Sequence, residues 1–253
     1  MKGAILNLRL AISFLTLLPV GNVGKGDLGK ALFAFPLVGL LIGVISVTAG
    51  FACQYLLAPP LHLIAVLITA TVLTGGLHLD GLADTFDALC SWRSREKKLK
   101  IMKDSRIGVM GALVLIFILL TKFVALGALA SHWWVGALLA PLWGRWATFY
   151  NLHFFPRANQ QGLAASIGAG SGWQFIIATA FTLSVSFFIW WQCGVPLTQQ
   201  LGLLLVLCLI THALAVKMSR SLGGVTGDTC GALSELTEIA LLLALSSPLF
   251  HLS

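Results

Sequence analysis

The chain is 253 residues long, 58% hydrophobic and only 10% charged, with a net charge of +7. This composition excludes an ordinary soluble domain, in which charged residues make up about a quarter of the chain. The apolar segments are continuous and do not alternate, which excludes a closed transmembrane barrel. We therefore expect an all-α, polytopic transmembrane helical bundle. The basic residues lie mostly in short loops without interleaved aromatic residues, so nucleic acid is not an expected partner.

The sequence predicts about seven spans in a single integral-membrane domain, residues 1–253. No Asp, Glu, Lys or Arg occurs in residues 31–79 or 158–216, and each stretch has room for two spans of about 20 residues. Residues 4–18 precede the first span and fit either a helix in the membrane interface or a short insertion. In chain order, the predicted spans cover about residues 31–57, 61–74, 107–130, 133–150, 173–192, 199–216 and 231–250.

Two of these spans contain residues that predict packing inside the bundle. Gly39 and Gly43 are four residues apart and give the first span a small-residue face for a neighbouring helix. Lys122 lies within the third span, where we expect its side chain to face the bundle or to snorkel.

The segment between the second and third spans concentrates the charge. Residues 75–106 hold five of the nine acidic residues, and Asp80, Asp84 and Asp87 follow at helical spacing. Because adjacent carboxylates repel, their alignment favours a bound Mg²⁺ or Mn²⁺, which prefers oxygen ligands and bridges carboxylates to phosphates. The alternative is a solvated helix start with Asp80 as its cap. Seven basic residues follow in 93–106, so the segment indicates a polyphosphate substrate.

The residues around this stripe are further candidates. His78 lies two positions before Asp80 and is either an interfacial packing histidine or a substrate ligand. Lys103, Asp104 and Arg106 open the third span. Asp104 is either a helix cap or a metal ligand, and Arg106 offers a planar fork that suits a phosphate. The basic residues at 93–100 are expected to anchor the cytoplasmic face or to contact anionic lipid.

A second acidic centre precedes the last span. The glycine- and threonine-rich run at 223–229 lacks a Walker lysine, but its backbone N–H groups and hydroxyls suit a phosphate. Asp228, Glu235 and Glu238 share a helical stripe, and the two glutamates are costly in a span unless a cation pairs with them. That cation is either a metal or, in a structural ion pair, Lys217 or Arg220. The expected substrate contacts here are Gly224, Thr226, Gly227, Thr229, Lys217 and Arg220.

The basic residues predict that these segments share one membrane face. Seven of them place the 93–106 loop in the cytoplasm. Counting spans from that loop returns residues 21–30, 151–172 and 217–230 to the same face, whereas the turns on the other face are short and uncharged. We therefore expect one composite cytoplasmic site.

Three stretches together resemble one family. GGLHLDGLADTFDAL at 75–89, KDSRIGVMGAL at 103–113 and GGVTGDTCGALSE at 223–235 are similar to cobalamin synthase, also called adenosylcobinamide-GDP ribazoletransferase. The resemblance covers nearly the whole chain in order. It implies a multi-pass, Mg²⁺-dependent enzyme of the cell inner membrane that acts late in cobamide synthesis. Such an enzyme joins adenosylcobinamide-GDP to α-ribazole or α-ribazole 5′-phosphate and releases GMP, and the sequence is compatible with a homo-oligomer.

The residue pattern and this resemblance lead to one hypothesis for the chemistry. Asp80 and Asp84, with further acidic residues, hold Mg²⁺ against the pyrophosphate of the GDP-activated corrinoid. The ribazole hydroxyl attacks the phosphorus on the cobinamide side, Asp87 takes its proton, and Arg106 helps to neutralise the leaving GMP. The expected metal ligands are Asp80, Asp84, Asp104, Asp228 and Glu235, the expected catalytic residues are Asp84, Asp87 and Arg106, and His78 and Lys103 are expected to bind substrate.

Two other classes of protein are alternatives. The core at Asp80–Ala83 is similar to CDP-alcohol phosphotransferases, which include phospholipid synthases. However, Asp84 stands where that family has Arg, and the later spacing of Gly and Asp is missing. An ion-coupled transporter needs charges near the bilayer midplane and paired halves. Here the acidic residues fall at span ends and no convincing internal repeat is found, so we favour the transferase.

Overall fold

The computed structural model describes residues 2–24, 26–159 and 162–250, and within them an isolated bridge between Arg157 and Val225 is the only β-type pairing. The predicted all-α class is confirmed. The helices are α1 (Lys2–Leu15), α2 (Leu28–Ala31), η1 (Leu32–Ala34), α3 (Phe35–Leu56), α4 (Leu61–Thr74), α5 (Leu77–Leu89), α6 (Arg95–Ile101), α7 (Val109–Ala128), η2 (Ala130–His132), α8 (Trp133–Phe154), α9 (Leu163–Ile167), α10 (Gly172–Gln192), α11 (Leu197–Leu222) and α12 (Gly227–Leu245).

Each of the seven predicted spans is helical, but fewer are long and apolar enough to cross a membrane alone. Among the described residues four segments meet that description: Leu28–Leu56, α7, α10 and α11. The bent pair of α4 and α5 gives a fifth. The helices α8 and α12 fall outside this set. Helix α8 contains four tryptophans and Arg145, and α12 contains three acidic residues. Other helices cover both of them. A helix enclosed by protein does not need an apolar surface all round.

The predicted small-residue face of α3 is confirmed. A Cβ atom on Gly39 would clash with the carbonyl oxygen of Pro141, and one on Gly43 would lie 2.7 Å from that of Leu138. The backbones of α3 and α8 therefore touch. On its other side α8 packs against α12, and the buried apolar side chains of these two helices contribute nearly half of the main core.

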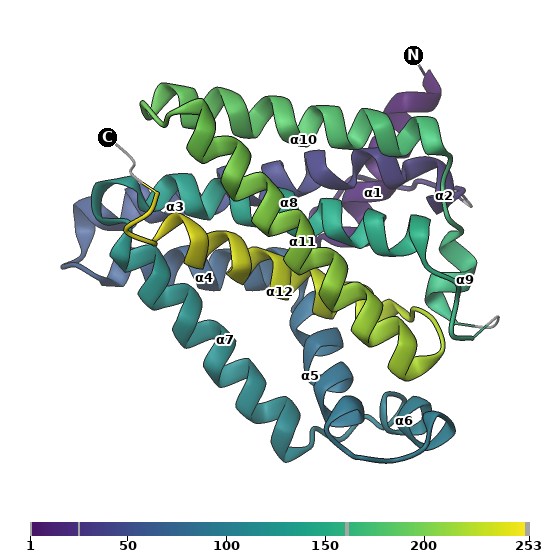
Figure 1. Cartoon of the computed structure of the whole chain (residues 1–253). Helices are drawn as coiled ribbons and strands as arrows, with labels where there is room; N and C mark the ends of the chain where they lie inside the picture. The colour runs from purple at the N-terminus through teal and green to yellow at the C-terminus, as the bar shows by residue number, and fades with distance from the viewer. Residues whose placement is uncertain (1, 25, 160–161, 251–253) are drawn as a thin grey trace.

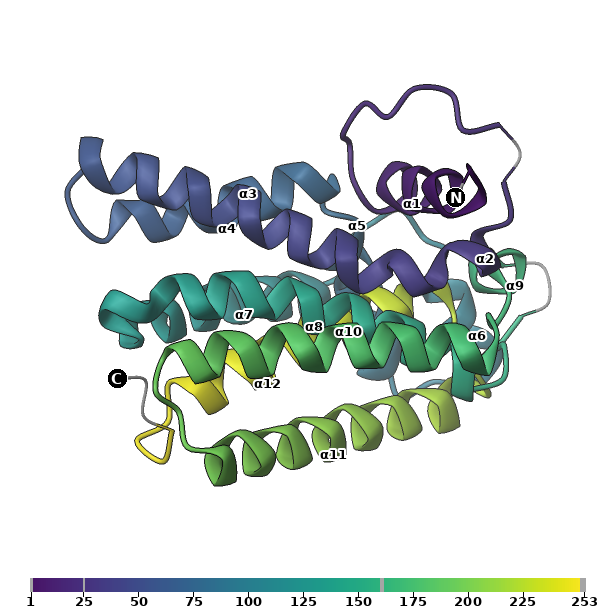
Figure 2. The ribbon, with the colours of Figure 1, turned by 90° about the horizontal axis from the view of Figure 1, so that it is seen from above.

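The segments with predicted chemistry lie at one end of the bundle. Figure 1 shows α2, α9, α6 and the turn before α12 towards the right and lower right, whereas the α3–α4, α7–α8 and α10–α11 turns lie at the opposite end. In Figure 2, α1 is seen nearly end-on while α3, α8, α10 and α11 run across the view. Because α1 lies across the long helices, with Leu10, Ala11 and Leu15 buried beside α3, its direction favours the interfacial alternative over an insertion.

Candidate active site

A glycine pair before α5 turns the chain away from the direction of α4. Gly75 and Gly76 have φ angles of 60° and 72°, which glycine adopts without steric cost. The two helices meet at 87°. Consequently α5, which carries Asp80, Asp84 and Asp87, leaves the line of α4 and runs towards α6 (Figure 1).

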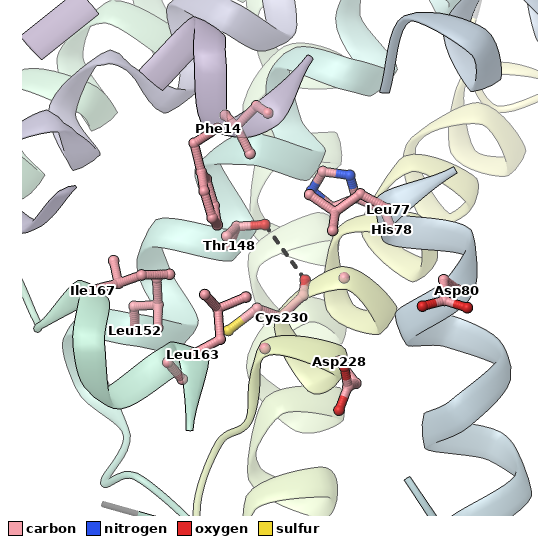
Figure 3. Close-up of a pocket in the computed structure, with 14 residues that line it drawn as sticks. Phe14, Leu77, His78, Asp80, Thr148, Leu152, Leu163, Ile167, Asp228 and Cys230 are labelled. Carbon is pink, nitrogen blue, oxygen red and sulfur yellow. Dashed lines mark hydrogen bonds between the residues drawn. The ribbon is translucent and has the colours of Figure 1, made fainter. Parts of the chain in front are cut away.

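A close crossing of α5 and α12 brings the two predicted acidic centres together. A Cβ atom on Gly81 would lie 2.8 Å from the carbonyl oxygen of Asp228 and 2.9 Å from its Cα. Gly231 of α12 faces the backbone of His78 in the same way, at 3.1 Å. Figure 3 shows Asp80 and Asp228 on these two neighbouring helices. The contact between two backbones therefore holds carboxylates from distant parts of the sequence at one place.

The carboxylates at this crossing repel one another. Burial, followed by the negative charges of Asp80, Asp228 and Asp87, raises the pKa of Asp84 from its ordinary 3.8 to about 6. Burial and the charge of Asp80 also raise the pKa of Asp228. A bound cation would relieve this repulsion, so the group is electrostatically suited to one.

The donor set fits Mg²⁺. Asp80, Asp84 and Asp228 offer only oxygen atoms, and Mg²⁺ commonly takes one or two carboxylates and completes its octahedron with water and substrate phosphates. Within the described residues, no three His, Cys, Asp or Glu side chains are already arranged as metal ligands. The carboxylates alone therefore form an incomplete site, which a phosphate-bearing substrate would complete.

Two adjoining hollows lie beside these carboxylates. The first has a volume of about 60 Å³, and its wall combines His78, Asp80 and Asp228 with the apolar side chains of Phe14, Leu15, Leu77, Leu152, Leu163 and Ile167 (Figure 3). The second, of about 120 Å³, includes Lys103 and Thr226. Asp228 and Gly227 line both, so Asp228 stands where the hollows meet. A carboxylate group next to a lysine suits a metal-bound phosphate.

Asp87, predicted as the general base, has a different environment. One of its carboxylate oxygens accepts from the backbone N–H of Gly108 at 2.7 Å, and the other accepts from that of Gly111 at 2.8 Å. These N–H groups belong to the first turn of α7, which lacks carbonyl partners within its own helix. Asp87 thus caps α7 from α5, and the geometry gives no support to its assignment as the base.

Asp104 and Arg106 bind each other. The guanidinium donates to both carboxylate oxygens of Asp104, at 3.0 and 2.7 Å, and this contact lowers the pKa of Asp104 to about 2. Both side chains are exposed. Asp104 is therefore a partner of Arg106 and not of the other acidic residues, whereas its neighbour Lys103 does face the second hollow.

The glutamates of α12 lie in a buried ion cluster. Lys122 donates to Glu235 at 2.7 Å and to Glu238 at 2.6 Å, and Arg145 donates to the other oxygen of Glu238. The ion pair weighed against a metal is thus present, but with Lys122 and Arg145 in place of Lys217 or Arg220. This pairing removes the electrostatic need for a metal at Glu235, which was among the predicted ligands.

His78 connects this cluster to the first hollow. Its ring is buried, and Nδ1 lies 3.4 Å from a guanidinium nitrogen of Arg145. Because a guanidinium can only donate, this contact assigns the ring proton to Nε2. His78 is therefore both a core residue and a wall of the site.

The glycine- and threonine-rich turn is held mainly by its own hydrogen bonds. Thr226 and Thr229 form a reciprocal capping box at the start of α12, at 3.1 and 2.8 Å. Gly224 has a φ of 142°, and a Cβ atom there would lie 2.5 Å from the backbone nitrogen of Ala158. Of the four predicted contacts in this turn, Gly227 and Thr226 line the hollows beside Asp228, and Thr229 is buried.

Lys217 and Arg220 lie on α11, exposed, and neither lines the two hollows at Asp228. Lys217 borders a separate cavity. Arg95 has a role that could not be predicted from the sequence, because it donates to the carbonyl oxygens of Leu222 at 2.8 Å and Ala158 at 3.1 Å. Backbone carbonyls have no sequence signature, so the basic segment gave no sign of this tie between α6 and the two loops.

Comparison with known proteins identifies the family of this chain. The family described as Cobalamin-5-phosphate synthase matches residues 7–246. An adenosylcobinamide-GDP ribazoletransferase of Roseiflexus sp. (strain RS-1) is 39% identical over 94% of this chain and 89% of its own length. Relatives of the same name from Herpetosiphon aurantiacus and Pseudomonas savastanoi pv. phaseolicola are 38% and 39% identical over 95% and 94% of this chain, and over 96% and 97% of their own lengths. No solved structure matches. The chain therefore belongs to the cobalamin-5-phosphate synthase family.

Proposed function

We propose that this chain joins adenosylcobinamide-GDP to α-ribazole, or to α-ribazole 5′-phosphate, and releases GMP in a Mg²⁺-dependent reaction. The relatives named for this activity are 38–39% identical to this chain over nearly its whole length. The observation that carries the proposal is the crossing of α5 and α12, which sets Asp80 and Asp84 beside Asp228 next to a lysine-lined hollow. We further propose that the bundle lies in the inner membrane, with this end facing the cytoplasm.

The reaction exchanges one phosphate bond for another. The ribazole hydroxyl oxygen bonds to the phosphorus on the cobinamide side, the bond from that phosphorus to the GMP oxygen breaks, and GMP leaves with the electron pair. The hydroxyl proton passes to the released GMP phosphate or to water. Asp80, Asp84 and Asp228 would hold Mg²⁺, which supplies the positive charge that a pyrophosphate and its leaving group need. Lys103 binds a phosphate from the adjoining hollow, and His78 and the apolar wall shape the first hollow. Arg106 is free to exchange Asp104 for a phosphate because the pair is exposed.

The test uses purified protein in detergent or nanodiscs with Mg²⁺, GDP-cobinamide and α-ribazole. We expect GMP and a cobamide to form together. In Asp84→Ala, the rate at which both products form should fall at least a hundredfold. Asp27→Asn is the matched control. Asp27 is an exposed residue in the turn before α2 whose side chain caps Gly29 at 2.9 Å, and asparagine keeps that oxygen.

The same preparation also tests the phospholipid-synthase alternative. CDP-diacylglycerol replaces GDP-cobinamide as the activated donor in a parallel reaction. Release of CMP from this donor, with no GMP from the corrinoid donor, contradicts the proposal. Equal GMP release by wild type and Asp84→Ala leaves the activity in place but removes Asp84 from the site.

A further inference from the structure

A large apolar cavity lies apart from the carboxylates, between α5, α6, α7, α11 and α12. Its volume is about 640 Å³, within the range of roughly 300 to 1,000 Å³ that is typical of ligand sites. Most of its wall is hydrophobic, from Phe86 and Leu89 of α5, Met110 of α7, Leu214 and Met218 of α11 and Leu236 of α12. None of these residues lines the two hollows at Asp228.

Two lysines line the polar side of this cavity. Lys98 of α6 donates to the hydroxyl of Ser221 at 2.8 Å, and Lys217 precedes Ser221 by one helical turn on the same face of α11. The Lys98 ammonium is thereby held at Ser221, one helical turn from the position of Lys217 on α11. No acidic residue is among those lining the cavity, so the repulsion between the two cations has no counter-charge in its wall. Such a pair favours an anion.

The cavity is also placed at the level of a membrane surface. The 26 residues of α11 give it a length of about 39 Å, whereas a bilayer's hydrocarbon core is about 30 Å thick. The last turns of α11, which carry Lys217 and Ser221, therefore reach the headgroup region when α11 spans the bilayer. Trp92, on the cavity wall, is 95% exposed, as is typical of an aromatic side chain at the membrane interface.

We propose that this cavity is a binding site for one anionic phospholipid, with an acyl chain against the apolar wall and the phosphate between Lys98 and Lys217. The positive charge of the two lysines and the position of the cavity near the membrane surface favour this occupant. A neutral lipid would leave the two ammonium groups unpaired, and a soluble anion would leave the apolar wall exposed to water. The proposal rests on the proposed membrane location and is independent of the proposed reaction.

The experiment uses the alkylation of Cys90, a half-buried free thiol on the cavity wall. Full-length protein is placed in nanodiscs of phosphatidylcholine, with or without phosphatidylglycerol, and N-ethylmaleimide modification is followed by peptide mass spectrometry. We expect phosphatidylglycerol to slow the alkylation of Cys90 at least fivefold. Cys208, exposed on α11, and Cys53, on α3, are internal references that should not change. Native mass spectrometry should show one retained phosphatidylglycerol.

Variants decide whether the cavity is responsible. The double variant Lys98→Gln/Lys217→Gln should lose the protection and the retained lipid, and so should Leu214→Trp, which fills the apolar side. Lys97→Gln removes an exposed charge of α6 outside the cavity and should keep both. Unfolding temperature confirms that each variant is folded, and a variant that unfolds is replaced by Ser221→Ala, which releases Lys98.

Three results overturn the proposal. The first is equal protection in the two lipid mixtures, and the second is protection that survives the double variant. The third is protection by glycerol phosphate alone or by the corrinoid and ribazole substrates without phosphatidylglycerol, because the cavity would then hold a soluble ligand. Loss of GMP release in the activity assay with intact lipid protection contradicts only the proposed reaction.

Discussion

Asp84 has a pKa of about 6 because burial and the neighbouring carboxylates disfavour its charged form. Folding therefore costs free energy when Asp84 is ionised, and stability is lost as the pH rises from the unfolded value near 4 through the folded value near 6. A shift of this size corresponds to about 3 kcal/mol for a fully buried group. Because Asp84 is only half-buried, solvent screening lowers the expected cost to about 1 kcal/mol.

We therefore predict that Asp84→Asn stabilises the protein at pH 7 to 8 without Mg²⁺, while it abolishes GMP release. The gain of about 1 kcal/mol should shrink as the pH falls and disappear near pH 3, where wild-type Asp84 is protonated in both states. Thermal unfolding across this pH range checks the prediction. Adding Mg²⁺ should raise the unfolding temperature of the wild type more than that of the variant. A variant less stable than wild type at pH 7 would contradict it.

The pKa of Asp84 also predicts the pH dependence of metal binding. A protonated carboxyl does not bind Mg²⁺, so the apparent affinity for Mg²⁺ should fall about tenfold per pH unit below pH 6 and level off above pH 7. Titrating GMP release with Mg²⁺ at each pH gives this profile. A profile that is flat from pH 5 to 8 would show that Asp84 is not a metal ligand.

For Asp87 we predict a structural role in place of a catalytic one, because both its carboxylate oxygens accept hydrogen bonds from backbone N–H groups in the first turn of α7. Asp87→Ala should lower stability by about 1 to 2 kcal/mol through the lost cap. Asp87→Asn keeps one acceptor and should retain most of the turnover when assayed below the unfolding range. Unfolding curves and kcat, measured on the same samples, separate the two roles. An Asp87→Asn protein with normal stability and no turnover would restore the original prediction of a general base.

Asp84 and Asp87 differ in how far their roles could be predicted from the sequence. Scarce carboxylates at helical spacing located the acidic group, and the structure brings Asp228 to it. The role of Asp87 was not predictable, because its partners are backbone N–H groups that every residue except proline carries.

At the scale of elements, the crossing of α5 and α12 positions the site. Gly81 permits it, since a Cβ atom there would lie 2.8 Å from backbone atoms that cannot move without moving α12. We predict that Gly81→Ala separates the two helices and lowers kcat/KM at least tenfold. Gly202→Ala in α11 is the control, because nothing lies within 4 Å of its added Cβ. Activity and unfolding temperature are measured for both. Normal kcat/KM in Gly81→Ala would contradict a requirement for the close crossing.

The helices themselves were largely predictable, because long apolar runs and their glycine or proline ends are local signals. Gly39 and Gly43 even identified a packing face. The interior positions of α8 and α12 were not predictable in the same way. Hydropathy reports which side chains a helix carries, whereas the cover that allows Arg145 and Glu238 to be buried comes from other helices.

At the scale of the whole molecule, the polar loops gather at one end, and their orientation in a cell is testable. We predict that an impermeant maleimide labels Ser131→Cys in intact cells, whereas Arg93→Cys is labelled only after permeabilisation. Both positions are exposed, and they lie in segments at opposite ends of the bundle. The wild type, with its five cysteines, gives the background. Labelling of Arg93→Cys in intact cells would reverse the proposed orientation.

The long-range ion pairs could not be predicted from the sequence. Lys122 contacts glutamates 113 and 116 positions away, and nothing in a single sequence ties one apolar helix to one acidic helix at such a separation. Lys217 and Arg220 were nearer in the sequence to these glutamates. Closeness in the sequence therefore predicted the wrong ion-pair partners, because tertiary packing decides which side chains meet.

The ion cluster imposes an order on biogenesis. In the proposed membrane location, Lys122 would enter the lipid when α7 is made, and an unpaired lysine at that depth costs several kcal/mol until a carboxylate arrives. Its carboxylates come only with α12, which follows all the other helices in the described chain and also brings Asp228. A nascent chain that ends before α12 would therefore lack the partners of Lys122 and also Asp228. The last described helix thus supplies both the counter-charges of the buried cluster and one carboxylate of the proposed site.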